Sequence, residues 1–347
     1  MHRRGDTGAA VAEVWARLAH LGYVNSTQSD VFDDELDRAV RTFQQERGLK
    51  VDGIVGPNTF RRLDEARWQL GDRVLRFVPG HLVRGDDVAD LQNRLNTLGF
   101  DAGRADGAFG SQTDAAVREF QRSVGDTADG TCGPDTFRAF ERLVRTVSGG
   151  NAANLRDRVT ISALQTGIAD KVVVIDPWFD EHDSVANEIT RSIAMRVEGR
   201  LAALGTQVFL TRSTTNALPD DISRADFANR TTADLLISIH CDRAASDRPN
   251  GISTYYFGEP DGGAFSYSGR ALAEQIQVEL CSRTQMHNNR THARTWDLLR
   301  MTRMPAVRVD IGYLSNPQDA ALLIEPSHQD VLAAGLAAAI SRFCKPV

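Results

Sequence analysis

The stretch Val172-Val173-Val174-Ile175-Asp176-Pro177-Trp178-Phe179-Asp180 decides how the second half of the chain is interpreted. Four β-branched residues in a row predict a buried strand. The Asp-Pro pair then ends it, because proline cannot donate to a strand ladder. The loop after such a strand is where an α/β domain usually places its chemistry. This loop carries Trp and Phe instead of His, Cys or Gly, so it is either an active site or the remnant of one.

From this stretch to the C-terminus, strand-like and helix-like segments alternate. This alternation predicts an α/β domain with a mainly parallel sheet. The expected strands are 171–176, 207–210, 235–240, 253–257 and 306–311, and the expected helices are 184–204, 221–231, 266–283 and 331–343.

The first 150 residues contain an internal repeat with an offset of 77 residues. Phe43-Gln44 recurs as Phe120-Gln121, and the Asp-Gly, Gly-Pro and Thr-Phe pairs that follow recur at the same offset. Apolar spacing of three to four residues predicts three helices in each copy. The fold class is therefore multidomain, with two small all-α modules of three helices followed by the α/β domain. The expected boundaries are 1–73, 74–147, a linker at 148–169 with a short helix within 155–170, and 170–347.

The composition is that of an ordinary globular protein, with 41% hydrophobic and 25% charged residues among 347. A net charge of −6 argues against nucleic acid as the main partner. No apolar run approaches the roughly 18 residues of a membrane span, and the N-terminus lacks the apolar core of a secretory signal. Four scattered Cys fit reduced thiols. These features predict a cytoplasmic protein.

The repeated segment resembles the three-helix peptidoglycan-binding module. Copy two carries the whole pattern, including Asp106-Gly107-Ala108-Phe109-Gly110, whereas copy one has diverged at Ser29-Asp30-Val31-Phe32-Asp33. Most of this motif is core and turn chemistry, which identifies a fold more firmly than a ligand. The resemblance implies binding of a muropeptide or wall precursor, and packing or protein contacts are the alternative.

Three segments of the second half resemble the zinc-dependent N-acetylmuramoyl-L-alanine amidases of the amidase-3 type. They are Val173–Pro177, Leu236–His240 and Met304–Pro317, the last of which contains Asp310-Ile311-Gly312-Tyr313-Leu314-Ser315-Asn316. The resemblance implies a metal held by His, Glu and His, with a catalytic carboxylate immediately before the Gly-Tyr-Leu-Ser-Asn segment.

Placed on this chain, the implied site is degenerate. Phe179 occupies the position of the first zinc ligand, and a phenyl ring has no lone pair to donate. Ala186 occupies the position of the second. His240 retains the third, and Asp310 retains an acid at the catalytic position with one methylene fewer. A hydrolytic zinc site needs three protein ligands and an open position, so we expect neither metal nor catalysis.

A rebuilt zinc site would have to combine His240 with other donors. Glu188 and His182 are the candidates, and Cys241 is a weaker one because it follows His240 on a strand and should face the opposite side. A hydrogen bond between His240 and Asp310 is the structural alternative. Trp178 and Phe179 are then expected to fill the space of metal and water. No phosphate-binding loop or serine-hydrolase motif offers other chemistry.

A basic segment precedes the last strand. Its arginines could grip carboxylates or phosphates of a wall precursor, and a solvated surface is the alternative. The candidate ligand-binding residues are Arg290, Arg294 and Arg300.

Two modules, an amidase-like domain and a degenerate metal site also occur together in a group of actinobacterial cytoplasmic regulators of peptidoglycan synthesis. Resemblance to that group implies a non-catalytic protein without cofactor. It would bind a precursor-synthesis enzyme, the UDP-GlcNAc enolpyruvyl transferase, under control of a Ser/Thr kinase. The alternatives are a peptidoglycan- or muropeptide-binding protein without an enzyme partner, and an active zinc amidase with a rebuilt site.

Overall fold

The structure, a computed structural model, describes residues 1–24, 29–144, 152–212, 220–258 and 265–346. The chain forms two compact units, Met1–Leu155 and Arg156–Val347.

The first unit contains two three-helix modules, as the sequence predicts. Each module has its own apolar core, built around Phe43 in copy one and around Phe120 in copy two. In copy two the rings of Phe120 and Phe140 stack with centroids 4.0 Å apart. The helices of copy one are α1 (Ala9–His20), α2 (Asp34–Glu46) and α3 (Pro57–Ala66), and those of copy two are α4 (Asp86–Thr97), α5 (Ser111–Ser123) and α6 (Pro134–Val144).

The buried Gln of each Phe-Gln pair holds the Asp-Gly turn that follows it. The amide nitrogen of Gln44 donates to Asp52 Oδ1 at 2.9 Å, and its oxygen accepts from the backbone N–H of Gly53 at 2.9 Å. Gln121 makes the same two bonds with Asp129 and Gly130, at 2.9 Å each. The buried glutamine side chain thus satisfies backbone groups of the turn.

Copy two contains a second turn of this kind, which copy one has lost. Gln92 donates to Asp106 Oδ1 at 2.9 Å and accepts from the N–H of Gly107 at 2.9 Å. Trp15 stands at the equivalent position of copy one, 77 residues earlier. Its buried indole Nε1–H donates to the carbonyl of Val31 at 3.0 Å. At residues 29–33, copy one therefore lacks the turn that Gln92 anchors in copy two. The indole of Trp15 makes a single hydrogen bond there instead.

Replacing Gln44 with Ala should destabilise copy one by about 1–3 kcal/mol, because buried turn groups lose their partners. The adjacent Gln45 is exposed, so Gln45→Ala is the matched control and should change stability little. Hydrogen–deuterium exchange of α2 in the full chain measures both effects. Equal exchange rates in the two variants would contradict the assigned role of Gln44.

The second unit begins within α7 (Ala152–Leu164), which lies in the stretch where a linker and a short helix are expected. Leu164 is buried in the core of the α/β domain, and Ile161 packs against that core. The backbone N–H of Ser268, at the start of helix Tyr267–Arg283, donates to Asp157 Oδ2 at 3.3 Å. Residues 157–164 of α7 thus pack on the α/β domain.

The α/β domain contains a six-stranded sheet in the order β2-β1-β3-β6-β4-β5, counted over the described residues. The sheet is mixed, because β4 pairs antiparallel with β6, and the other pairings are parallel. The strands are β1 (Val172–Pro177), β2 (Gln207–Leu210), β3 (Leu235–Asp242), β4 (Ile252–Phe257), β5 (Asn288–Arg294) and β6 (Ala306–Tyr313). Strand β5, in the basic segment, is not among the strands expected from the sequence.

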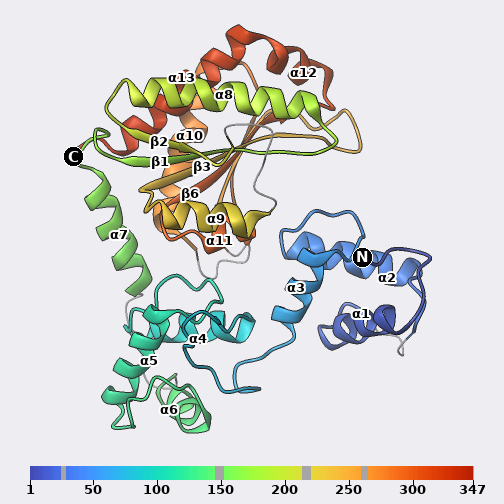
Figure 1. Ribbon diagram of the computed structural model, residues 1–347, viewed down its shortest axis with the longest axis vertical. Helices are drawn as coiled ribbons and strands as arrows, with labels where there is room; N and C mark the ends of the chain where they lie inside the picture. Colours follow the sequence, from blue (N-terminus) through green and yellow to red (C-terminus); the bar gives the residue numbers. More distant parts are fainter. Residues whose placement is uncertain (25–28, 145–151, 213–219, 259–264, 347) are drawn as a thin grey trace. The chain divides into compact units, whose positions relative to one another are not determined.

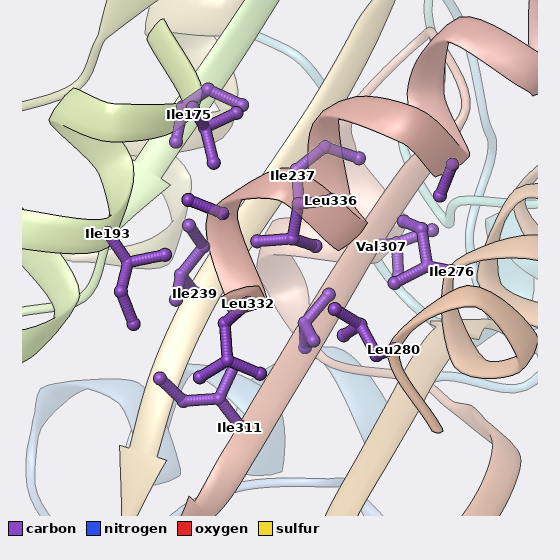
Figure 2. Close-up of a cluster of buried hydrophobic side chains, with 14 of the residues drawn as sticks. Ile175, Ile193, Ile237, Ile239, Ile276, Leu280, Val307, Ile311, Leu332 and Leu336 are labelled. Carbon is purple, nitrogen blue, oxygen red and sulfur yellow. The ribbon is translucent and has the colours of Figure 1, made fainter. Parts of the chain in front are cut away.

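Helices cover both faces of this sheet (Figure 1). Strands buried on both faces read as nearly continuous apolar runs, which explains the run Val172–Ile175. One face packs against α8 (Ser184–Ala202), α10 (Tyr267–Arg283) and α13 (Pro326–Phe343), with α12 (Pro317–Ile324) preceding α13. Figure 2 shows this core, where Ile237, Val307 and Leu336 are among the fully buried side chains. The other face packs against α9 (Asp221–Arg230) and α11 (Asp297–Met301).

Candidate functional site

The site lies on the α9 and α11 face of the sheet, where register aligns polar residues in two rows. Cα pairing places Asp176, Ser238, Arg308 and Tyr255 on adjacent strands in one row. Residues two positions along a strand share a face. The next row therefore contains His240 and Asp310, which are direct partners between β3 and β6, and Ser253 of β4. The sheet thus brings together Asp176, His240 and Asp310, which the sequence placed in three separate segments.

Asp176 is a fully buried carboxylate with a complete set of donors. Its Oδ1 accepts from Thr211 Oγ1 at 2.5 Å, and its Oδ2 accepts from Ser238 Oγ at 2.5 Å. Arg224, from α9, forms an ion pair with Oδ2 at 2.6 Å. A buried charge is tolerated only when it is paired and hydrogen-bonded. Arg224 therefore fixes α9 to the end of β1.

His240 is buried and uncharged. Its Nε2 lies 2.8 Å from Ser238 Oγ. Because the single hydroxyl proton of Ser238 is donated to Asp176, the bond requires the proton on Nε2 of His240. Burial lowers the pKa of His240 well below its usual value, and the positive charges of Arg308 and Arg224 lower it further. The imidazole thus donates through Nε2, and only Nδ1 keeps a lone pair.

Asp310 does not bond His240, contrary to the structural alternative considered from the sequence. It pairs with Arg308, two residues earlier on β6, through contacts of 2.6 and 3.1 Å. Burial raises the pKa of Asp310, and the charge of Arg308 acts against that shift. Ser238 and Arg308, which share the face, are instead the partners of His240 and Asp310.

The aromatic pair of the opening stretch lies against two different groups. The ring of Trp178 stacks on His240 with centroids 5.1 Å apart and an interplanar angle of 25°. The ring of Phe179 lies under the guanidinium of Arg212, at 4.8 Å. Trp178 thus covers the surviving histidine, while Phe179 packs against a cation of the neighbouring strand end.

The other proposed donors do not converge on His240. Ala186 is buried in the first turn of α8 and packs in the core of the opposite face. Glu188 and His182 are exposed. Cys241 is buried in that same opposite core, as its place on the strand predicts, and burial raises the pKa of its thiol.

A zinc ion held by three protein ligands does not fit these residues. Phe179 and Ala186 present no lone pair, and both oxygens of Asp310 face a guanidinium. His240 therefore keeps one lone pair, on Nδ1, but lacks two further ligands beside it. Among the described residues, no group of three His, Cys, Asp or Glu side chains is arranged to hold a metal ion.

The basic segment does not form one ligand-binding cluster. Arg290 is exposed on β5, at a positive φ of 67°. Arg294, on the same strand, lies over the ring of Tyr255 at 5.6 Å. Arg300 is buried on α11 and pairs with Asp297 at 2.9 Å. Arg290 and Arg294 present their charge near solvent, whereas Arg300 has a structural contact.

Sequence reasoning missed Arg224, Ser238 and Arg308, although one signal was available. Arg308 interrupts an otherwise apolar buried strand and stands two residues before Asp310, so it must share its face. Arg224 gave no such signal, because an arginine on a predicted helix outside every motif looks like a surface residue.

These observations define a class: an amidase fold preceded by two peptidoglycan-binding modules. The family described as N-acetylmuramoyl-L-alanine amidase matches residues 173–342, and the family described as putative peptidoglycan binding domain matches residues 7–63 and 84–140. Both matches confirm the resemblances drawn from the sequence. No helix among the described residues combines the length and apolarity that crossing a membrane requires.

The particular family follows from a relative that matches nearly the whole chain. The sequence is 42% identical, over 98% of this chain and 88% of the relative, to the N-acetylmuramoyl-L-alanine amidase CwlM of Mycobacterium tuberculosis. The chain therefore belongs to the CwlM family. It is also 29% identical to the N-acetylmuramoyl-L-alanine amidase LytC of Bacillus subtilis, over 52% of this chain and 37% of LytC.

A solved amidase from Clostridium difficile 630 is 24% identical and covers 49% of this chain and 95% of its own, with a TM-score of 0.46.

The buried neutral state of His240 predicts a specific pH dependence. Its pKa is lower in the folded chain than the unfolded value of about 6.5, so acid favours the unfolded state. The free energy of unfolding should fall below pH about 6.5, by up to about 1.4 kcal/mol per pH unit for this one group. In His240→Gln this contribution should disappear. Urea unfolding at several pH values measures it, and His182→Gln, which changes an exposed histidine, should retain the wild-type slope.

Proposed function

We propose that the chain is a non-catalytic, amidase-like regulator of cytoplasmic peptidoglycan precursor synthesis. The observation that carries the proposal is the state of His240, the one retained ligand. Its ring is covered by Trp178, and its Nε2 proton is bonded to Ser238. A zinc amidase needs a metal-bound water at an open coordination position, and the residues around His240 supply neither the remaining ligands nor that position.

The fold around the site is nevertheless complete. The sheet, both apolar faces and the closing strand β6 are present. Retention of a fold whose site has been rebuilt with non-ligating side chains favours a binding role over hydrolysis. The proposed partner is a precursor-synthesis enzyme, the UDP-GlcNAc enolpyruvyl transferase. Control by a Ser/Thr kinase, a cytoplasmic location and the absence of a cofactor belong to the same proposal.

A second function, binding of peptidoglycan or a muropeptide, is favoured by copy two. That module has both Gln-anchored Asp-Gly turns, at Gln92 and Gln121. Copy one retains only the turn at Gln44, and Trp15 fills the place of the other. We therefore expect any ligand of this type to bind copy two in preference to copy one.

Metal analysis of the purified full chain tests the absence of catalysis. We expect zinc well below one equivalent after exposure to excess zinc and desalting, and no release of peptide from peptidoglycan. Near-stoichiometric zinc that is lost in His240→Ala, together with hydrolysis, would show a rebuilt amidase instead.

Two retention experiments separate the regulator from the wall-binding protein. The tagged chain should retain purified UDP-GlcNAc enolpyruvyl transferase in biolayer interferometry and should change its turnover. In a parallel sedimentation assay, purified peptidoglycan is the probe. Retention by the polymer alone would contradict the regulator proposal, and Gln121→Ala compared with Gln44→Ala would then show which module binds.

A further inference from the structure

Two guanidinium groups stand beside His240, where the resemblance to the zinc amidases implies a metal. Arg224 pairs with Asp176 at 2.6 Å, and Arg308 pairs with Asp310 at 2.6 Å. Both carboxylates have side chains only 1% exposed. Together the two arginines balance two buried negative charges on one face of the sheet.

Arg308 is held in place from several sides. Its guanidinium lies 4.3 Å above the ring of Trp296 and 5.8 Å from that of Tyr255. It contacts Asp310 through two nitrogens and lies 4.0 Å from Asp242. An arginine that is stacked on aromatic rings and paired in a forked geometry is preorganised and cannot easily turn away.

The position of Arg308 places its charge beside the metal-binding histidine of the fold. Arg308 is the strand partner of Ser238, whose Oγ lies 2.8 Å from His240 Nε2. Asp310, to which Arg308 is paired, is the strand partner of His240 itself. A divalent cation at His240 would therefore face a fixed positive charge across one strand spacing, with the nearest carboxylate already neutralised.

We propose that Arg308 supplies the positive charge that a metal would supply to Asp310, and that it excludes divalent cations from His240. The loss of ligands at Phe179 and Ala186 is then only half of the change, because restoring them leaves the guanidinium in place. The inference rests on the non-catalytic part of the proposed function and makes no use of the protein partner.

The test restores the ligands in the presence and absence of Arg308. The restored chain carries Trp178→Gly, which uncovers the ring of His240, and Phe179→His, which returns a nitrogen ligand. The comparison chain adds Arg308→Met, which keeps the length of the side chain without its charge. Isothermal titration with Zn²⁺, and the visible absorption of bound Co²⁺, measure binding to each full-length protein. Arg308→Met should tighten metal binding by roughly tenfold or more, and His240→Ala should abolish the gain.

A matched control and a conservative variant complete the design. Arg200 forms an exposed pair with Asp330 on the opposite side of the sheet, and Arg200→Met should leave metal affinity unchanged. Arg308→Lys keeps the charge and should exclude the metal as arginine does. If Arg308→Met does not fold, as judged by circular dichroism and thermal unfolding, Arg308→Gln replaces it.

Equal metal affinity with and without Arg308, whether both chains bind or neither does, overturns the proposal. The zinc content of the unmodified chain tests the proposed function separately. A filled wild-type site would therefore refute the proposed function, whereas equal affinities in the restored pair would refute only the role of Arg308.

Discussion

The α/β domain depends on the balance of buried charge at the end of β1. Asp176 is fully buried, and its carboxylate is acceptable there only because Thr211, Ser238 and Arg224 all donate to it. These donors come from the end of β2, from β3 and from α9. One carboxylate therefore connects two neighbouring strands and the helix that covers them, and it orients Ser238 toward His240.

A second buried carboxylate, on β6, also requires neutralisation. There Asp310 is neutralised by Arg308, and the aromatic rings of Trp296 and Tyr255 hold the guanidinium. A buried ion pair gives little net stability, but removing one partner leaves an uncompensated charge. Each of the two buried carboxylates, Asp176 and Asp310, is thus paired with an arginine of its own. Both buried carboxylates are therefore neutralised by side chains of the chain itself.

Most of the folding energy lies elsewhere in the domain. The core that includes Ile237, Val307 and Leu336 is on the opposite face, packed against α8, α10 and α13 (Figure 2). Burial of apolar surface of this kind does not depend on a metal. The stability of the fold and the chemistry of the site therefore rest on different sets of residues.

The two N-terminal modules show the same separation between fold and local chemistry. Both copies keep the Gln that anchors the second Asp-Gly turn, because that turn connects two helices of each core. The first turn survives only as Gln92 in copy two. In copy one a tryptophan indole makes a single bond in its place, and the three helices pack nevertheless. The modules thus share an architecture and differ in the polar surface that a ligand would meet.

The sequence by itself determined the repeat and the two classes of domain. These properties follow from local patterns, namely the offset of the repeat and the periodicity of the apolar residues. The assignment of Phe179 and Ala186 to ligand positions rests on the resemblance to the zinc amidases. It predicted a mainly parallel sheet but not the antiparallel β4–β6 pairing or strand β5.

Only the tertiary structure decided the partners of His240 and Asp310. Those partners depend on the register between β1, β3 and β6 and on α9, whose Arg224 is distant in sequence from every motif. The local sequence does not show which polar side chain will bond His240 or Asp310. The pairing of distant strands and helices decides this, and here the partners are Ser238 and Arg308.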